Sequence, residues 1–385
     1  MGICFSKPKV TDLSLTREVK EDDSENKPRA RRQNVRLSVV AAAGPENNIE
    51  ELPESAKTVA VESIKSNIET SRPKIEFRVK VEGELPNGHQ QGFEDKKQKI
   101  EGISDISEIT PLGIGFACKK GLKPDQFNQD DFSIIVDPDF KFFGVFDGHG
   151  SYGHRISNYV HSQLPELIIS HPSFSINPQE AISDSFQKVN QCLFSQCLRL
   201  ESNFDCKFSG TTATTAFIMN NHLIISHVGD SRAVLGVKKD NICEARRITT
   251  DHKANVPSEM ERIISNDGVV KKLPDDFPYR IFVKGKEYPG LSTSRAIGDS
   301  VAQTVGVIPI PEIHDLEITE DFEFLLMCSD GVWEFLSDQE AINIVKKYEK
   351  NTQLAAMKLA SSAWSKWIEH EESVVDDITV IVVHL

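Results

Sequence analysis

From about residue 106 onward, the chain alternates short apolar runs with polar segments that contain Gly, Asp or Asn. Each run is rich in β-branched or aromatic residues, which is the pattern of a β-strand. The six clearest runs cover residues 141–146, 214–220, 222–228, 232–237, 322–328 and 378–385. Apolar positions at helical spacing predict helices over 155–170, 178–198, 352–370 and a segment that begins at Ser337. Strands and helices occur in groups and do not strictly alternate, so the pattern predicts an α+β fold.

Two of these helices have recognisable N-terminal capping residues. Asn177 directly precedes Pro178, and Ser337 stands three residues before Glu340 in a capping box. Such side chains satisfy backbone N–H groups that the first helical turn leaves without partners. The starts of both helices are therefore well defined by the sequence.

The first 105 residues differ from the rest of the chain in composition. They contain only three aromatic residues, Phe5, Phe77 and Phe93, although the whole chain has 21 Phe, 5 Tyr and 3 Trp. A segment so poor in large apolar side chains cannot offset the entropy cost of ordering. We therefore expect residues 1–105 to be a mostly disordered extension and residues 106–385 to form one globular domain. A short docked strand near residues 74–85 is compatible with the alternating pattern there.

Charge and cysteine content narrow the class of protein. The 385 residues include 44 Lys and Arg against 58 Asp and Glu, so the net charge is −14. This argues against a nucleic-acid partner, because phosphate backbones bind basic surfaces. Seven cysteines without regular spacing argue against a secreted disulfide framework, and no apolar run approaches the roughly 18 residues that span a bilayer. We expect a soluble, cytoplasmic monomer.

Aspartates stand at the ends of several predicted strands. Asp147, Asp230 and Asp330 each follow a strand, Asp376 precedes one, and Asp130 precedes the apolar run FSIIV. Strands of one domain end on shared rims, so these carboxylates can converge, and clustered carboxylates repel unless a cation neutralises them. Oxygen ligands without a matching set of His or Cys favour Mg²⁺ or Mn²⁺ over Zn²⁺. A single Asp-Gly pair would indicate only a turn, but several at strand ends favour a metal site.

Eight segments together resemble a known family. In order they read NQDDFSIIVD, FFGVFDGHG, SGTTATTAFI, HVGDSRAVLG, TTDHKANVPSEMERI, GLSTSRAIGD, CSDGVWEFL and DDITVIVV. The series resembles the metal-dependent Ser/Thr protein phosphatases of the type-2C class and covers residues 128–385. The resemblance implies a central sandwich of two antiparallel sheets, flanked by helices on both sides, with a dinuclear metal site at one end. It also implies phosphoprotein substrates.

The resemblance assigns metal ligands residue by residue. Asp147 resembles the carboxylate that bridges two Mg²⁺ or Mn²⁺ ions, and the Gly148 carbonyl resembles a ligand of one of them. Asp330 and Asp376 resemble the carboxylates that hold the other ion. Asp376 is chosen over Asp377 because the family usually has Asp-Asn before the final strand.

Further residues are assigned to the reaction and to the surroundings of the metal ions. Asp130 resembles an outer-shell residue that holds a metal-bound water, and Asp230 resembles a residue that holds a weaker third ion in some members. The resemblance implies in-line attack of a metal-bridging hydroxide on phosphoserine or phosphothreonine, with Asp147 as a catalytic ligand. His149 resembles the general acid that protonates the leaving oxygen. Without the motif, His149 would be read as a turn residue that hydrogen-bonds Asp147.

The sequence departs from the family pattern at two positions. Gln129 stands where the family often has an acidic residue, so one outer-shell charge is missing. Asp125 stands where the family usually has a phosphate-binding Arg. Lys123 is the nearest cation and is our candidate for phosphate binding, although an ammonium lacks the two-pronged geometry of a guanidinium.

The segment over about 255–290 corresponds to a variable flap beside the active site of the family. We expect it to influence substrate choice, with an ordinary surface loop as the alternative. Arg295 and Asp299 of the SRAIGD motif are interpreted as an ion pair that supports the core and not as catalytic residues.

The N-terminus fits a lipidation pattern. The residues MGICFS match M-G-x-x-x-[ST], which predicts myristoylation of Gly2, and the neighbouring Cys4 is a candidate for palmitoylation. One acyl chain binds membranes only marginally, so Cys4 or nearby lysines would supply the second signal. The resulting expectation is peripheral contact of part of the protein with the cytoplasmic face of a membrane.

The sequence offers two alternative functions. Residues 148–153 match G-x-G-x-x-G, but Asp147 would lie against the pyrophosphate of a dinucleotide. A non-catalytic pseudophosphatase scaffold of the same fold is the stronger alternative, suggested by Gln129 and Asp125. Retention of a repelling carboxylate cluster argues for the enzyme.

Overall fold

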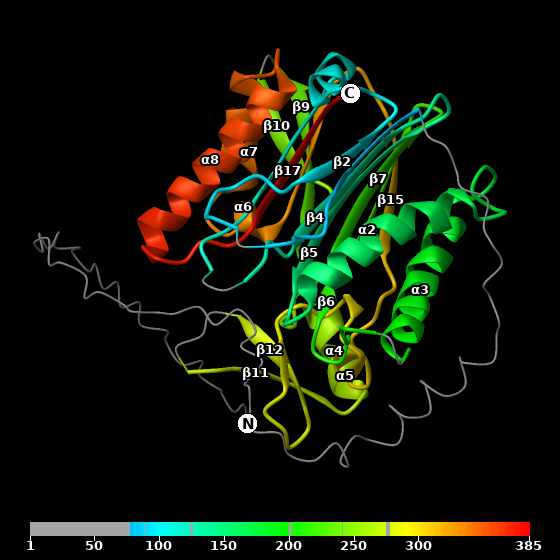
Figure 1. Ribbon diagram of the computed structural model, residues 1–385, viewed down its shortest axis with the longest axis vertical. Coiled ribbons are helices and arrows are strands. Elements are labelled where there is room, and N and C mark those ends of the chain that lie inside the picture. The colour runs from blue at the N-terminus through cyan, green and yellow to red at the C-terminus, as the bar shows by residue number, and fades with distance from the viewer. Residues whose placement is uncertain (1–77, 89, 124–125, 200–201, 241, 275–277) are drawn as a thin grey trace, which may run out of the picture. The chain divides into compact units, whose positions relative to one another are not determined.

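Two antiparallel β-sheets pack face to face, and helices cover their outer faces (Figure 1). The computed structural model describes residues 78–385 except 89, 124–125, 200–201, 241 and 275–277. The larger sheet has the order β15 (Glu312–Glu317), β8 (His222–Val228), β7 (Ala213–Met219), β5 (Lys141–His149), β4 (Asp130–Val136), β1 (Val79–Gly83) and β2 (Gln98–Glu101), with the short β6 (Gly210–Thr211) and β14 (Ile297–Gly298) beside it. The smaller sheet has the order β10 (Ile242–Arg247), β9 (Arg232–Lys239), β16 (Phe322–Cys328), β17 (Ile378–His384) and β3 (Ile114–Lys119).

The alternation of side chains along each strand explains the layers. On β5, Phe143 and Val145 point into the core between the sheets, whereas Phe142 and Phe146 point outward. The outward side chains are covered by α2 (Gly153–Ile169) and α3 (Pro178–Cys197). The outer face of the smaller sheet is covered by α6 (Asp330–Trp333), α7 (Asp338–Lys347) and α8 (Thr352–Glu371). The predicted α+β sandwich with helices on both sides is therefore confirmed.

The predicted helix caps are also confirmed. The Asn177 side chain accepts a hydrogen bond from the Glu180 N–H at the start of α3. Ser337 and Glu340 form the reciprocal capping box of α7. A 3-10 helix, η3 (Ile106–Leu112), precedes β3.

The boundary predicted at residue 106 is too late for the folded part of the chain. β1 pairs with β4, and β2 pairs with β1, so both belong to the larger sheet. The strand expected near 74–85 is β1, and Val81 on it is completely buried in the core between the sheets. Composition gave the wrong boundary because the apolar contacts of this segment are made with other strands of the larger sheet. The part of the extension over residues 1–77 lies outside the described residues.

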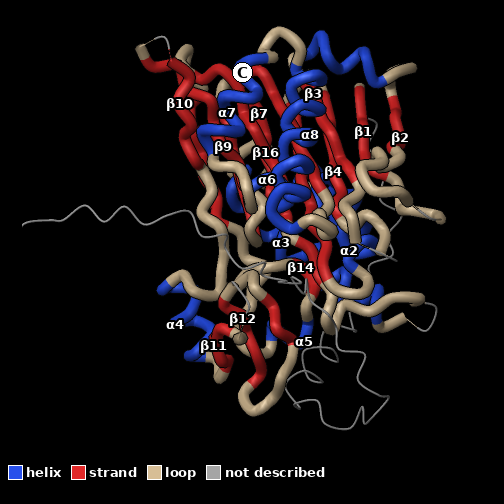
Figure 2. The backbone as a smooth tube through the Cα atoms, turned by 90° about the vertical axis from the view of Figure 1, so that its left-hand side faces the viewer, coloured by secondary structure: helices blue, strands red, loops and turns tan. Residues whose placement is uncertain are grey.

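The predicted flap is a small folded unit and not an irregular loop. It contains α4 (Pro257–Ser265) and a three-stranded sheet of β11 (Gly268–Lys272), β12 (Tyr279–Val283) and β13 (Pro289–Leu291). A separate apolar cluster holds it together and includes Ile263, Ile281 and Leu291, with Val305 following the short α5 (Ser300–Gln303). Figure 2 shows α4, β11 and β12 beyond one end of the sandwich strands. Among the described residues, no helix combines the length and apolar character needed to cross a membrane.

Candidate active site

Asp130 and Asp147 lie opposite each other, where β4 begins and β5 ends, because these strands are antiparallel neighbours. Thr212 holds the Asp147 backbone: its hydroxyl accepts from the Asp147 N–H at 3.0 Å, and its own N–H donates to the Asp147 carbonyl at 2.9 Å. A Cβ at Gly148 would lie 2.4 Å from the Gly153 carbonyl oxygen, so glycine is required by this close approach. The segment that carries the predicted bridging ligand is therefore tightly placed.

The smaller sheet brings Asp330 and Asp376 to the same end of the sandwich. Asp330 begins α6 directly after β16, and Asp376 stands just before β17. These two strands are antiparallel, with Cys328 opposite Val380, so the end of one meets the start of the other. Asp230 lies in the turn that leads from β8 in the larger sheet to β9 in the smaller one.

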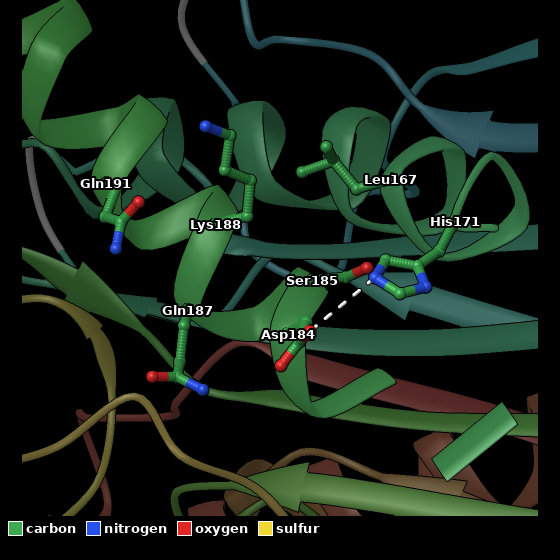
Figure 3. Close-up of a pocket in the computed structure, with 7 residues that line it drawn as sticks. All are labelled: Leu167, His171, Asp184, Ser185, Gln187, Lys188 and Gln191. Carbon is green, nitrogen blue, oxygen red and sulfur yellow. Dashed lines mark ion pairs between the residues drawn. The ribbon is translucent and has the colours of Figure 1, made fainter. Parts of the chain in front are cut away.

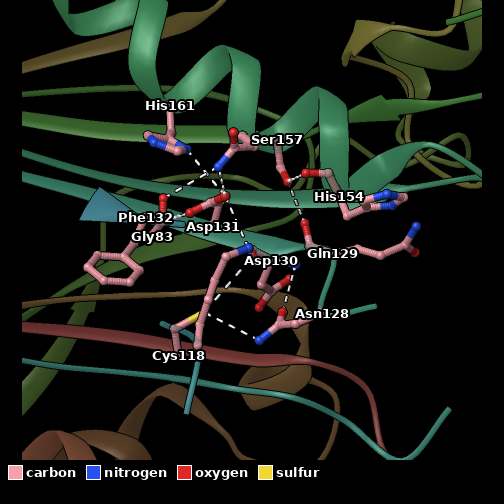
Figure 4. A network of polar contacts seen from close by, with 12 residues as sticks. Gly83, Cys118, Asn128, Gln129, Asp130, Asp131, Phe132, His154, Ser157 and His161 are labelled. Atoms are coloured by element: carbon pink, nitrogen blue, oxygen red, sulfur yellow. Dashed lines mark hydrogen bonds and ion pairs between the residues drawn. The ribbon is translucent and has the colours of Figure 1, made fainter. Parts of the chain in front are cut away.

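Asp130 connects the two sheets. Its Oδ2 accepts hydrogen bonds from the Ser329 hydroxyl at 2.7 Å and the Thr379 hydroxyl at 2.8 Å, both from the smaller sheet. On its own sheet, its backbone N–H donates to the Asn128 side chain at 3.0 Å (Figure 4). Asp130 is 1% exposed, so it can orient a neighbour from behind but is poorly placed to meet substrate directly. This position agrees with the predicted outer-shell role, which stays a prediction.

Electrostatics show that the aspartates act on one another. Removal from water raises the pKa of Asp147 well above its usual range, and repulsion from the other four aspartates raises it further. The same two causes raise the pKa of Asp330 to about 7, with Asp376 as its strongest repelling neighbour. Burial and the charge of Asp377 raise the pKa of Asp130 to about 8. Such carboxylates are fully ionised at neutral pH only if positive charge is supplied.

Two lysines supply part of that charge. Lys123 forms an ion pair with Asp376, and Lys253 forms one with Asp230 at 3.2 Å. Burial would lower the pKa of the Lys123 ammonium, but Asp376 and its acidic neighbours raise it well above the usual range. The predicted phosphate-binding residue thus lies at the candidate centre, although its ammonium contacts a carboxylate. Asp125 lies outside the described residues.

His149 is held by Asp299 and not by Asp147. Its Nε2 lies 2.6 Å from Asp299 Oδ2, and the Asp299 side chain is 2% exposed. Burial would lower the pKa of His149, but the charge and hydrogen bond of Asp299 raise it above 6.5. Asp299 adopts a left-handed conformation (φ 49°), which aspartate tolerates better than most residues. The Arg295–Asp299 ion pair expected from the sequence was wrong, because Arg295 instead contacts Glu259 at 2.7 Å.

The structure also separates the roles of two adjacent aspartates and explains Gln129. Asp377 accepts hydrogen bonds from the backbone N–H groups of Gly121 at 2.6 Å and Gln129 at 2.8 Å, so it fastens two loops. Asp376 is left to contact Lys123. The Gln129 amide donates to the Gly150 carbonyl at 2.6 Å and supports the turn that follows Asp147. The side chain that the sequence marked as a missing outer-shell charge therefore binds the protein backbone.

The donor set fits a hard divalent ion. It consists of carboxylate oxygens and a backbone carbonyl, and oxygen ligands of this kind prefer Mg²⁺ or Mn²⁺. Within the described residues, one group of three His, Cys, Asp or Glu side chains has ligand atoms that all lie within 4.8 Å of one another, and it is His227, Glu312 and His314. The aspartates therefore form a wider set than this histidine group. The number of ions they hold is a proposal.

One surface pocket has lining residues that differ from those of the aspartate site. It has a volume of about 420 Å³ and lies between α2 and α3 (Figure 3). His171 and Asp184, two of the residues that line it, form an ion pair at 3.6 Å. None of the predicted site residues lines it, so we do not regard it as the active site.

Comparisons with known proteins agree with the motifs. The family described as protein phosphatase 2C matches residues 122–371. Probable protein phosphatase 2C 35 of Arabidopsis thaliana is 33% identical over 68% of this chain and 80% of its own length. Probable protein phosphatase 2C 65 of the same plant is 31% identical over 79% and 85%, respectively. The chain belongs to the protein phosphatase 2C family.

A solved structure supports the fold of this phosphatase. Serine-threonine phosphatase 2C from Toxoplasma gondii superposes with a TM-score of 0.63 over 70% of this chain and 94% of the other, at 23% identity. The chain is thus a metal-dependent protein serine/threonine phosphatase that acts on phosphoproteins with divalent ions such as Mg²⁺ or Mn²⁺. The family match ends before Asp376, so that ligand depends on the strand-end pattern and on its place in the structure.

Sequence reasoning missed three contributors to the site. Asp299 as the partner of His149 was assigned to the wrong ion pair, and Lys253 beside Asp230 was not considered. Gln129 was treated as a loss of charge, whereas its amide supports the Gly150 turn. The signal for Asp299 and Lys253 was their place inside the segments GLSTSRAIGD and TTDHKANVPSEMERI, but only the fold reveals their partners.

Proposed function

We propose that this phosphatase hydrolyses phosphoserine and phosphothreonine at a centre of two divalent ions. Asp147 and the Gly148 carbonyl, together with Asp330 and Asp376, would hold the ions. The observation that supports this most is the gathering of aspartates from both sheets at one end of the sandwich, where burial and their acidic neighbours raise the pKa values of Asp147 and Asp330. A fold has no structural need for such repulsion unless a cation relieves it.

The protein's own residues divide the remaining work. When bound, two such ions would lower the pKa of a shared water and neutralise charge on the phosphoryl oxygens. Asp130 would orient that region from behind through its link to both sheets, and Asp230 would offer a further, weaker cation position. Lys123 lies close enough to the aspartates to meet a phosphoryl group once Asp376 is otherwise engaged.

His149 is the proposed proton donor to the leaving seryl or threonyl oxygen. Its ring is partly exposed, with 18% of the side chain accessible, so a substrate oxygen can reach it. Asp299 accepts from Nε2 and holds the ring in one orientation while raising its pKa. An imidazole with a pKa near the working pH can give up a proton within the reaction.

The test is hydrolysis of a phosphothreonine peptide by the full-length protein. We expect release of phosphate with Mn²⁺ or Mg²⁺, its disappearance with a chelator, and its loss in Asp147→Asn. Asp184→Asn, which changes an exposed aspartate on α3, serves as the matched control and keeps full activity. Activity that survives both chelation and Asp147→Asn would contradict the two-ion proposal. A folded protein inactive with every metal would instead favour the scaffold.

We also propose that Gly2 is myristoylated and Cys4 palmitoylated, which would place part of the protein at the cytoplasmic face of a membrane. The support is the N-terminal sequence alone, since these residues lie outside the described part of the chain. Mass spectrometry of the N-terminal peptide from the native source tests both modifications. An unmodified peptide would remove the membrane proposal and leave the phosphatase proposal intact.

A further inference from the structure

Two histidines and one glutamate lie together at the β15 edge of the larger sheet. Glu312 on β15 lies directly opposite His227 on β8, and His314 stands two residues further along β15. Residues two apart on a strand share a face, so all three side chains lie on the same side of the sheet. Their ligand atoms all lie within 4.8 Å of one another. This is the spacing of groups that bind one ion.

The tautomer of His227 is set by the backbone. Its Nε2 lies 2.9 Å from the Thr250 carbonyl oxygen, which can only accept, so Nε2 carries the proton. The lone pair is then on Nδ1, and among the described residues no group donates to that buried atom. His227 itself is completely buried. Metal-binding histidines typically donate their second N–H to a backbone carbonyl in this way.

His252 supports this group from the second layer. It accepts a hydrogen bond from the Gly229 N–H at its Nδ1, 3.2 Å away, so its proton lies on Nε2 when the ring is neutral. That Nε2 lies 3.5 Å from the Glu312 carboxylate, and the ring stacks on His227 with centroids 4.3 Å apart.

A vacant lone pair among buried rings is costly unless a ligand meets it. His314 Nε2 is likewise buried without a partner among the described residues. The nearby Arg295 does not donate to these histidine nitrogens, because it pairs with Glu312 at 3.3 Å and with Glu259. A cation is the species that neutral imidazoles and a carboxylate bind together.

We infer that His227, Glu312 and His314 form a second metal site, selective for a transition metal ion such as Zn²⁺. Two imidazole nitrogens and one carboxylate match the donors of three-residue zinc sites, which leave a fourth position for water. The aspartate centre offers oxygen ligands and suits Mg²⁺ or Mn²⁺, so the two sites differ in chemistry as well as in residues. This inference does not depend on the proposed phosphatase mechanism.

The site lies where the sandwich meets the flap. Glu312 is linked through Arg295 to Glu259 on α4 of the flap, and Ser294 also donates to Glu259 at 2.6 Å. An ion bound by Glu312 would therefore stabilise the edge of the larger sheet next to the ion pairs that connect this edge to the flap. Its expected role is structural.

The experiment measures zinc binding by the full-length protein in excess Mg²⁺. Equilibrium dialysis against Zn²⁺ with metal analysis gives the stoichiometry, and Co²⁺ substitution reports nitrogen ligation through its visible absorption. The variants are Glu312→Gln and His314→Gln. His222→Gln is the matched control, because His222 contacts Asp315 on the same two strands but lies outside the group. Repeating the measurement in Asp147→Asn separates this site from the aspartate centre.

We expect one Zn²⁺ per chain in the wild type, His222→Gln and Asp147→Asn proteins, and at least roughly tenfold weaker binding in Glu312→Gln and His314→Gln. Glu312 is part-exposed, so its variant should fold even if a histidine variant does not. Zinc binding that is equal in all proteins, absent from all, or lost only in Asp147→Asn would overturn the inference.

Discussion

Two groups of buried or half-buried acids sit at the same end of this protein and behave in opposite ways. The carboxyls of Asp147 and Asp330 have pKa values raised by burial and by one another. Burial would also raise the pKa of Glu259, but hydrogen bonds from Arg262, Arg295 and Ser294 outweigh it and hold that pKa well below its usual range. The difference is the presence of arginines.

The comparison separates acidic side chains that stabilise the fold from acidic side chains that bind a ligand. Glu259 lies in a fully satisfied network between α4 and the SRAIGD segment, so its charge stabilises the flap. Among the described residues, the ion pairs of Asp376 and Asp230 are with Lys123 and Lys253, and the raised pKa values of Asp147 and Asp330 show that the group is left short of positive charge. An uncompensated acidic cluster lowers stability and is retained for binding a cation.

The largest expected effect is on the activity of Asp147→Asn. Loss of a ligand shared by both ions should lower kcat/KM on the order of 1000-fold or more, about 4 kcal/mol. In the metal-free protein the same change should raise the free energy of unfolding by about 1 kcal/mol, because an Asn of the same shape spares the folded state the cost of keeping Asp147 protonated among its acidic neighbours. Thermal melts with chelator, beside Asp184→Asn, measure this. A loss of metal-free stability would break the comparison.

Glu259→Gln should have the reverse profile. The change leaves Arg262 and Arg295 without their buried partner, so we expect a loss of about 3 kcal/mol in the free energy of unfolding. Urea denaturation measures it. Glu244→Gln removes the exposed pair with Lys239 and should cost less than about 1 kcal/mol. Equal losses in the two variants would show that the Glu259 network does not stabilise the flap.

The contribution of Glu259 should depend on pH in a defined direction. Its folded-state pKa is depressed, so the stabilisation is fully present above its ordinary pKa of 4.5 and is lost as the pH falls toward the depressed value. Between about pH 4.5 and 3.5 the stability gap between wild type and Glu259→Gln should narrow by about 1 kcal/mol. A gap that stays constant across this range would mean that the carboxylate is not preferentially ionised in the folded state.

Most of the sandwich could be predicted from the sequence, because its strands are short, apolar and bounded by turn residues. β8 and β16 match their predicted bounds, and the caps of α3 and α7 were visible as residue patterns. β1 and β2 could not be assigned from composition, because β1 is placed by pairing with β4 across a long stretch of chain and β2 by pairing with β1. The flap sheet was missed because its strands pack on a small separate core.

The site was predicted where a residue type and a strand end coincide. Asp147 and Asp330 follow directly from that rule, but the partner of a side chain does not. His149 could have faced Asp147 or Asp299, and only the 2.6 Å contact between His149 Nε2 and Asp299 Oδ2 in the structure shows which. The histidine site was invisible for the same reason, since His227 and Glu312 become neighbours only through the pairing of β8 with β15.

The smallest predicted effect concerns Lys123, for which sequence and structure suggest different roles. Because its ammonium contacts Asp376, a divalent ion must compete with it, so Lys123→Gln should lower the half-saturating Mg²⁺ concentration roughly threefold. Phosphopeptide hydrolysis over a Mg²⁺ titration measures this, with Lys239→Gln as an exposed control. If KM for the phosphopeptide rises while the Mg²⁺ dependence stays unchanged, Lys123 binds phosphate as the sequence suggested. In that case the ammonium does not compete with a metal ion for Asp376. The ion pair between Lys123 and Asp376 would then neutralise less of the negative charge of the aspartates than the structure suggests.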